Sequence, residues 1–276
     1  MRFLPTNQIW RYWSFERFLT DVASLDIRDV DLWLCNQHVN IDAHAVYNAS
    51  EVARLVSRYG VRIRTLTPEQ SNPKAYNIAS SDSQVQRLTE GYYRQIVSLA
   101  ARLGARRISV NAGWRLLDDD PSRAWDALCT MLRAICHMAA EEGIEVCVEP
   151  LSRTQYRLVM DADGLSRLLG EVNEKNLRAT LDTGTIARNG DSLSAHLREV
   201  GERVGYVHLT NLDPHVFAHL GWGDSRGVLE PGAVLQELEA HGYEGDCALE
   251  MTASAYYDRP REALARSIET LKGCER

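Results

Sequence analysis

Four residues that can bind a divalent metal ion lie at or near the ends of four short apolar segments in the second half of the sequence. They are Glu149, Asp182, His208 and Glu250. A charge at the end of a buried strand is unfavourable unless something pairs with it, so four such residues indicate a shared cation. Three carboxylates and one imidazole suit Mn²⁺, Mg²⁺ or Co²⁺ better than a structural zinc ion, which prefers cysteine and histidine. The sequence therefore predicts one divalent metal ion, Mn²⁺ first, with Mg²⁺, Co²⁺, Ni²⁺ or Zn²⁺ as alternatives.

Such a metal site leaves coordination positions open for two oxygens of a substrate. A hydroxy-ketone can chelate there, and the metal then stabilises the enediolate that forms when a C–H proton leaves. Glu149 and Glu250 could lie on opposite sides of that substrate, as proton removal and return on opposite faces require. The sequence thus leads to the hypothesis that these two glutamates are the catalytic acid and base.

Eight short apolar segments, several of them rich in β-branched residues, are predicted to be the strands that position these side chains. The predicted strands are Arg2–Pro5, Asp29–Leu34, Val61–Leu66, Ala105–Val110, Ile144–Glu149, Leu177–Asp182, Val204–Leu209 and Asp246–Met251. A helical pattern follows each strand, which implies parallel strands joined by crossover helices. Eight such units favour a single (β/α)8 TIM barrel, an α/β fold with one domain spanning residues 1–276. A doubly wound open sheet is the alternative, but no G-x-G-x-x-G motif follows the first strand.

The helical segments begin and end at recognisable signals. Ser14 and Asn48 are predicted to cap helices, Pro121 takes the first helical position after Asp120, and Gly60 is a predicted stop. The predicted helices are Ser14–Leu25, Asn48–Gly60, Ser81–Leu103, Pro121–Glu142, Asp161–Leu169, Asp191–Val200, Pro231–His241 and Arg259–Leu271. The segment Thr210–Glu230 is predicted to be an unusually long loop.

Other polar and aromatic residues follow predicted strands at the barrel end where active sites form. Glu69 follows the third strand, from which a lid over the pocket could arise, and Asn111 and Trp114 follow the fourth. We expect all three to bind substrate, with Trp114 stacking on a sugar face. Loop capping by Glu69 and a place for Trp114 at the rim of the core are the alternatives.

The composition excludes several classes of protein. The 276 residues carry a net charge of −7, with 45% hydrophobic and 25% charged residues, which excludes a disordered chain, a collagen or a small disulfide scaffold. The acidic balance argues against a nucleic-acid partner, and no segment is apolar enough for a membrane span or a secretory signal. The six cysteines form no C-x-x-C pair and predict buried, reduced thiols in a cytoplasmic protein.

The four candidate ligands occur in local strings that resemble a known superfamily. The strings are Val-Glu-Pro-Leu around Glu149, Leu-Asp-Thr-Gly around Asp182, Tyr-Val-His-Leu around His208 and Gly-Tyr-Glu-Gly-Asp-Cys-Ala-Leu-Glu ending at Glu250, at spacings of 33, 26 and 42 positions. They resemble the xylose isomerase-like TIM-barrel sugar isomerases and epimerases, and the first two spacings resemble the ketose 3-epimerase branch. Within that branch, Thr67-Pro68-Glu69 and Glu149-Pro150-Leu151 are most similar to the fructoselysine 3-epimerases.

The resemblance implies a metal-dependent epimerisation at C3 of a ketose or a ketose conjugate. It implies that Glu149 and Glu250 are both metal ligands and the acid and base, and that Asp182 and His208 complete the metal site. The implied partner is a small-molecule sugar, and the resemblance leaves a homodimer or a homotetramer open.

Three positions depart from the pattern of the resembling family. Thr185 stands where many of these epimerases have a histidine, Gln155 where many have a substrate-contacting glutamate, and Pro214 where an arginine is common. His219 resembles a family histidine that precedes a glycine-rich turn, and it could orient substrate, support the metal site or lie in a surface loop. We therefore expect Gln155, Thr185 and His219 to bind a modified or conjugated sugar, in preference to free fructose, tagatose or psicose.

Alternative functions stay open at this point. A dehydratase or an isomerase of a keto-inositol, dehydroshikimate or a keto-glycoside would keep the same single metal ion. An endonuclease would need further histidine and acidic ligands and a basic groove, which Asn111 and the net charge of −7 disfavour. A non-enzymatic binding barrel is disfavoured by the complete set of four ligands.

Overall fold

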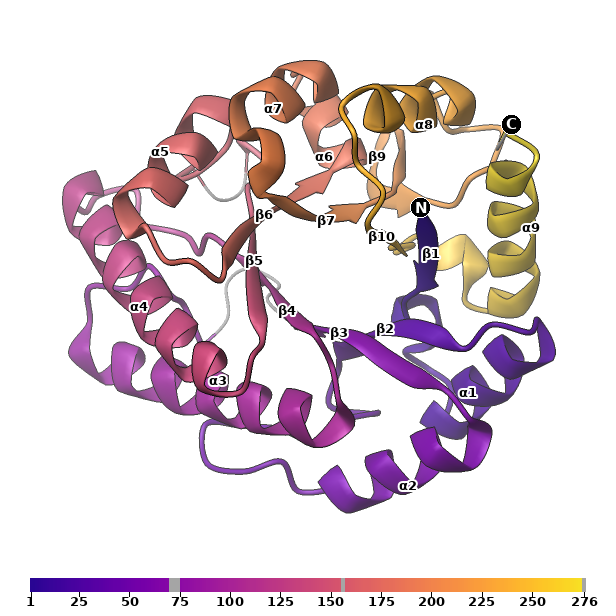
Figure 1. The fold of residues 1–276 in the computed structure, drawn as a ribbon, viewed down its shortest axis with the longest axis horizontal. Coiled ribbons are helices and arrows are strands. Elements are labelled where there is room, and N and C mark those ends of the chain that lie inside the picture. The colour runs from indigo at the N-terminus through magenta and orange to yellow at the C-terminus, as the bar shows by residue number, and fades with distance from the viewer. Residues whose placement is uncertain (70–74, 155–156, 275–276) are drawn as a thin grey trace.

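A parallel sheet curls into a nearly closed barrel at the centre of the protein (Figure 1). The computed structural model describes residues 1–69, 75–154 and 157–274. Its barrel strands pair in the order β1-β10-β7-β6-β5-β4-β3-β2, and an isolated parallel bridge between Thr6 and Asp31 links the two ends. The strands are β1 (Arg2–Pro5), β2 (Asp29–Leu34), β3 (Arg62–Pro68), β4 (Arg107–Asn111), β5 (Glu145–Glu149), β6 (Leu177–Asp182), β7 (Val204–His208) and β10 (Asp246–Leu249). The TIM barrel predicted from the sequence is therefore confirmed.

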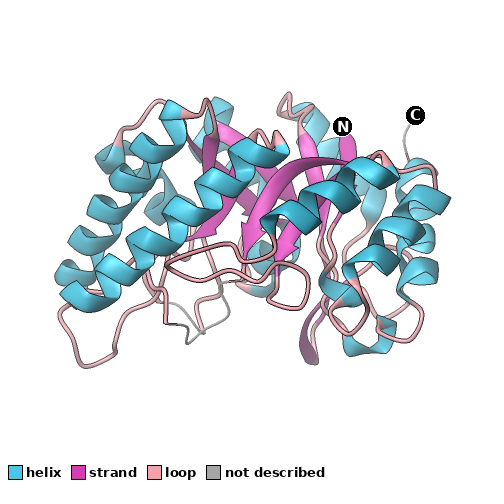
Figure 2. Cartoon of the chain, turned by 90° about the horizontal axis from the view of Figure 1, so that it is seen from below, coloured by secondary structure: helices cyan, strands magenta, loops and turns pink. Residues whose placement is uncertain are grey.

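Helices surround the barrel and cover the outer face of the sheet (Figure 1). They are α1 (Phe15–Ser24), α2 (Ala49–Tyr59), α3 (Ser83–Leu103), α4 (Pro121–Glu141), α5 (Ala162–Val172), α6 (Thr183–Arg188), α7 (Leu193–Val200), α8 (Pro231–Ala240) and α9 (Pro260–Lys272), with the 3-10 turns η1 (Gln8–Trp10), η2 (Gly201–Arg203) and η3 (Ser254–Tyr256). Figure 2 shows the strand arrowheads pointing to one end, where long loops gather. We call this end the mouth, and it is where TIM barrels carry their active sites.

The opposite end of the barrel is closed by paired buried charges. Arg107, at the start of β4, lies 2.8 Å from Asp246 Oδ2 at the start of β10, and Arg64 lies 3.1 Å from the same oxygen. The Arg107 guanidinium also lies 4.9 Å from the centre of the Tyr206 ring. Buried ions are tolerated when they are paired in this way. This end of the barrel therefore holds the strands together, and the candidate ligands lie at the mouth.

Most of the helix signals act as predicted. Ser14 and Asp120 each accept a hydrogen bond from a backbone amide in the first turn of α1 and α4. Gly60 ends α2 with a φ of +61°, a conformation that favours glycine. Asn48 occupies the N-cap position of α2 as predicted, but its side-chain oxygen accepts a hydrogen bond from the Asn40 amide and caps no amide of α2.

Two parts of the fold differ from the sequence prediction. Strand β6 is followed by both α6 and α7, where the sequence predicted one helix over Asp191–Val200, because the side chain of Asp182 caps an additional turn. The segment predicted as a long loop, Thr210–Glu230, contains the antiparallel hairpin β8 (Asn211–Asp213) and β9 (Val216–Leu220). Strand β8 has only 3 residues and β9 begins with exposed apolar ones, so neither shows the burial pattern by which strands are recognised.

The cysteines are free, as the sequence predicted, and all of them except the half-buried Cys274 are buried. Burial raises the pKa of the Cys147 thiol to about 12, so this thiol is protonated and unreactive at neutral pH. In the described part of the chain, no helix combines the length and the apolar character needed to cross a bilayer.

Candidate active site

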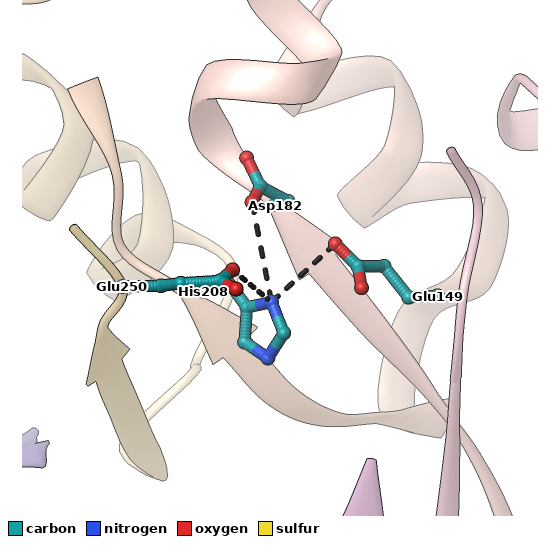
Figure 3. A group of neighbouring side chains, drawn as sticks. All are labelled: Glu149, Asp182, His208 and Glu250. Carbon is teal, nitrogen blue, oxygen red and sulfur yellow. Dashed lines mark ion pairs between the residues drawn. The ribbon is translucent and has the colours of Figure 1, made fainter. Parts of the chain in front are cut away.

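Four side chains converge at the mouth from four neighbouring strands (Figure 3). Glu149 ends β5, Asp182 ends β6, His208 ends β7 and Glu250 follows β10 directly. His208 Nδ1 lies 3.3 Å from Glu149 Oε1, 3.1 Å from Glu250 Oε2 and 3.9 Å from Asp182 Oδ2. One ligand atom from each residue lies within 4.8 Å of those of the other three. The structure thus brings together the four residues singled out in the sequence, in an arrangement that could hold a metal ion.

The two oxygens of Asp182 have different surroundings. Oδ1 accepts hydrogen bonds from the Thr185 amide at 2.6 Å and from the Thr210 hydroxyl at 2.8 Å. Oδ2 is buried and has no hydrogen-bond partner among the described residues. A Cβ atom on Gly184 would lie 2.5 Å from Thr210 Oγ1, so a side chain there would displace the hydroxyl. The Thr185 amide and the Thr210 hydroxyl therefore fix one carboxylate oxygen of Asp182, and the other faces the site.

The ring of His208 is oriented so that Nδ1 faces the three carboxylates. Its Nε2 lies 3.5 Å from Ser109 Oγ inside the barrel, and the Tyr206 ring packs edge-on against the imidazole with ring centres 5.3 Å apart. Nδ1 is buried and makes no hydrogen bond within the described part of the chain. Two atoms of the candidate ligands, His208 Nδ1 and Asp182 Oδ2, thus face one centre without a hydrogen-bond partner among the described residues. Because buried polar atoms are nearly always paired and these are metal-ligating types, the four residues fit a divalent ion.

The charges of the site shift the pKa values of its members in opposite directions. Burial alone would lower the pKa of His208, but the carboxylates of Glu149 and Glu250 outweigh burial and raise that pKa well above its ordinary value. Burial raises the pKa of Glu149. For Glu250, burial is outweighed by His208 and His219, which hold the pKa well below its ordinary value. In the metal-free site a proton on His208 therefore balances the carboxylates, and a divalent cation would replace that proton.

A second histidine, His219 on β9, reaches the same carboxylates from the hairpin. Its Nδ1 lies 3.5 Å from Asp182 Oδ2 and 3.6 Å from Glu250 Oε2. Burial opposes a charge on this ring, but Asp182 and Glu250 outweigh it and raise the pKa of His219 to about 9. The structure thus places His219 beside two of the candidate ligands, and its role toward a substrate stays a prediction.

Comparison with known protein families gives the affiliation of this barrel. The family described as "Xylose isomerase-like TIM barrel" matches residues 19–274. The chain belongs to this family. The superfamily resemblance read from the four ligand strings is therefore confirmed.

Relatives of this xylose isomerase-like barrel match it over most of its length. It is 20% identical to fructoselysine 3-epimerase of Escherichia coli O157:H7 over 257 residues, which cover 93% of this chain and 92% of that protein. It is 25% identical to 3-dehydro-D-guloside 4-epimerase of Escherichia coli K12 over 193 residues, 65% of this chain and 69% of that protein. The crystal structure of D-allulose 3-epimerase from Methylomonas sp. with D-allulose has the same fold, with a TM-score of 0.81, 16% identity and coverage of 100% of this chain and 97% of that one. These relatives are epimerases, which are isomerases.

In this member of the xylose isomerase-like family, a cavity of about 210 Å³ opens beside the four candidate ligands. Three of the residues predicted to bind substrate line it, namely Asn111, Thr185 and His219. Asn111 ends β4 and pairs with Glu149 in the register of the sheet, so the two side chains enter the cavity from adjacent strands. The backbone amide of Thr185 already holds Asp182, which leaves its side chain to border the cavity.

The other three residues predicted to bind substrate are placed differently. Glu69 directly follows β3, and neither it nor Trp114 belongs to the described lining of the cavity. The backbone of Trp114 is fixed by the side chain of Asn77, through hydrogen bonds of 3.1 and 2.8 Å. Gln155 lies outside the described residues. A substrate contact for these three residues stays a prediction.

Several lining residues were missed in the sequence. Gln8, Arg11 and Trp33 line the cavity, and Gln8 donates a hydrogen bond from Nε2 to Glu250 Oε1. These residues come near or after the ends of the first two strands, so the rule that TIM-barrel active sites follow the strands was the signal that could have found them. Phe217 also lines the cavity, but it lies on the hairpin that the sequence did not predict.

Proposed function

We propose that this protein is a divalent-metal-dependent epimerase that inverts C3 of a ketose or of a ketose conjugate. The observation that carries the proposal is the placement of Glu149 and Glu250 on either side of Asp182 and His208, beside one cavity. The relatives named for the 3-epimerisation of fructoselysine and of allulose support this choice of carbon. The oligomeric state and the cytoplasmic location stay predictions from the sequence.

Epimerisation removes a proton from one face of a carbon and returns a proton to the other face. One glutamate takes the C3 proton as a carboxylate, the electron pair stays on the substrate as an enediolate, and the other glutamate donates a proton from the opposite side. Glu149, Asp182, His208 and Glu250 would hold a divalent ion, which we propose to be Mn²⁺, and the ion would supply positive charge that stabilises the enediolate. The side chains of Glu149 and Glu250 are only 11% and 14% exposed, so both carboxyl groups would act in a largely desolvated site.

Neighbouring side chains hold Glu250 in its ionised form. Gln8 donates a hydrogen bond to Oε1, and His219 Nδ1 lies 3.6 Å from Oε2. A donor on one oxygen and a positive charge beside the other both favour the carboxylate. Glu250 is thus ready to act as the base toward the epimer whose C3 proton faces it, and Glu149 takes that role in the reverse direction.

A second candidate is epimerisation at C4 of a keto-glycoside. The 25% identity with 3-dehydro-D-guloside 4-epimerase favours it. The same pair of glutamates would act in this reaction. The carbon that is inverted depends on how the sugar binds, because it is the carbon that lies between the two glutamates. No comparable observation favours the dehydration of a keto-inositol or of dehydroshikimate.

Exchange with deuterated solvent tests both candidates. The Mn²⁺-loaded protein is incubated in D₂O with a panel of ketoses, fructosamines and keto-glycosides, and the products are examined by NMR. Deuterium at C3 supports the proposal, deuterium at C4 supports the second candidate, and no exchange in any sugar refutes an epimerase. Glu149→Gln and Glu250→Gln should each lower turnover at least about 100-fold, whereas Glu244→Gln, at an exposed position, should leave it unchanged.

A further inference from the structure

Arg11 borders the cavity and has no carboxylate partner among the described residues. Arg11 follows η1 directly and lines the same cavity as Glu149, His208 and Glu250. Its Nε donates a hydrogen bond of 3.0 Å to the carbonyl oxygen of Gln8, whose side chain in turn donates to Glu250. Gln8 therefore connects the Arg11 guanidinium with Glu250, a proposed catalytic residue.

Aromatic rings fix the position of this guanidinium. It lies 4.9 Å from the centre of the Trp33 ring and 5.4 Å from that of the Tyr257 ring. Contacts of this kind stabilise a cation and restrict its rotamers without neutralising its charge. Arg11 is thus held in one place before any ligand arrives.

The donors at the end of Arg11 have no acceptor in the described part of the chain. No carboxylate of residues 1–69, 75–154 or 157–274 forms an ion pair with it, and its Nη atoms make no hydrogen bond with these residues. Two other arginines differ, since Arg17 on α1 lies 3.0 Å from Asp21, and Arg153, which follows β5, lies 2.8 Å from Asp191. The planar guanidinium of Arg11, whose Nη atoms donate to none of these residues, matches the geometry of a carboxylate or a phosphate.

An anionic ligand would need the positive charge of Arg11, because the other positive charges of the site are already balanced. The three carboxylates of the metal site exceed the charge of one divalent ion, and the charge of His219 faces two of them, at 3.5 Å from Asp182 Oδ2 and 3.6 Å from Glu250 Oε2. Neither cation is therefore available to a distant anion. Among the described residues that line the cavity, Arg11 is the one arginine, and there is no lysine. An anionic substituent on the sugar could therefore be neutralised at Arg11.

We propose that Arg11 determines specificity by binding an oxyanion, a carboxylate or a phosphate, that the sugar substrate carries away from its reacting carbon. The inference rests on the proposed function, and it adds a charged substrate class to it. Because Arg11 contacts a part of the substrate that does not react, it binds ground state and transition state alike. Its removal should therefore act on KM more than on kcat.

Kinetics with matched sugars test the proposal. The kcat/KM of the Mn²⁺-loaded protein is measured for fructose, for fructose 6-phosphate and for a fructose–glycine conjugate. The two anionic sugars distinguish binding of a phosphate from binding of a carboxylate. Hydrogen bonds to a charged group predict that Arg11→Gln lowers kcat/KM for the preferred anionic sugar about 10- to 100-fold. Turnover of fructose should change less than about threefold, and Arg11→Lys should recover part of the loss because it keeps the charge.

The control is Arg153→Gln, which removes the same charge at the mouth from an arginine that is already paired with Asp191. It should leave the ratio of anionic to neutral turnover unchanged. Equal losses on neutral and anionic sugars in Arg11→Gln would overturn the proposal, because they would show that Arg11 only supports the wall of the cavity. A native protein that prefers neither anionic sugar to fructose would overturn it as well.

Binding of inert polyols separates this inference from the proposed function. Sorbitol 6-phosphate and gluconate carry the anion but have no ketone to epimerise, and their binding to the metal-loaded protein is measured by calorimetry against sorbitol. We expect at least one anion to bind more tightly than sorbitol, and to lose this advantage in Arg11→Gln. Equal binding of all three polyols would refute the role of Arg11, whereas a failure to exchange deuterium with any ketose would refute the epimerase alone.

Discussion

Replacing Asp182 by asparagine should separate metal binding from folding. Asp182→Asn keeps a side-chain oxygen that can accept from the Thr185 amide and the Thr210 hydroxyl, so α6 should keep its cap. It replaces Oδ2, which is buried without a partner in the described structure, by an NH₂ group that cannot bind a cation. We therefore expect a folded protein whose affinity for metal is reduced.

The size of the effect follows from the position of the lost atom. Removing a residue that only orients a ligand weakens metal binding about 10- to 100-fold, so removing the ligand itself should weaken it at least about 100-fold. When metal saturates both proteins, a 100-fold loss removes about 2.7 kcal/mol of metal-dependent stabilisation. For a chain of 276 residues, that lowers the metal-dependent rise in Tm by about 5 °C. Thermal unfolding followed by circular dichroism, with Mn²⁺ and with EDTA, measures the metal-dependent stabilisation and the rise in Tm.

The matched control is Asp26→Asn, which removes the same charge from a side chain that is 95% exposed. Its rise in Tm with metal should equal that of the native protein. If Asp182→Asn folds and shows the full native rise, Asp182 is not a ligand and the reasoning from its unpaired oxygen fails. If Asp182→Asn fails to fold in EDTA, the carboxylate is needed mainly to cap α6.

Three further experiments probe the surroundings of the site. Thr210→Val removes the hydroxyl that holds Asp182 Oδ1 and should weaken metal binding about 10- to 100-fold in calorimetry; an unaltered affinity would contradict this role. Because the pKa of His208 is raised in the metal-free site, metal must displace a proton near neutral pH, and affinity should rise about tenfold per pH unit. Titration heats that do not depend on the ionisation enthalpy of the buffer would rule out that proton release. Asp246→Asn leaves Arg107 buried without its 2.8 Å partner and should lower the free energy of unfolding by about 3 to 5 kcal/mol in urea, and a loss below about 1 kcal/mol would show that the pair is dispensable.

The barrel and the convergence of the four candidate ligands could be predicted because their signals are local. Strands buried on both faces are short apolar runs, and each ligand stands at the end of one such run, as Glu149 does after Val-Cys-Val. Parallel strands direct their carboxyl ends to one mouth, so residues far apart in sequence had to meet once the strands were recognised. The order of the strands then placed Glu149 and Glu250 on the two sides of the site.

The hairpin could not be predicted, because its strands are held by contacts that leave no pattern in the sequence. Strand β8 is 3 residues long, and β9 starts with the exposed residues Val216 and Phe217. His219 therefore could be matched to a family position but not placed in space. Its approach to Asp182 and Glu250 depends on the hairpin pairing and on the hydrogen bond from its amide to the Thr252 hydroxyl.

By itself, the sequence determined that eight strand–helix units form a barrel and that three acids and a histidine meet at its mouth. Hydrophobic patterns and helix caps are local signals that span only a few residues. The geometry of a parallel barrel then brings the ends of the predicted strands together. The tertiary structure decided which oxygen of Asp182 faces the site, that Gln8 holds Glu250, and that Arg11 lies against Trp33 and Tyr257. These facts depend on contacts such as that between Gln8 and Glu250, which are 242 positions apart, and no local preference of the chain encodes a contact over that distance.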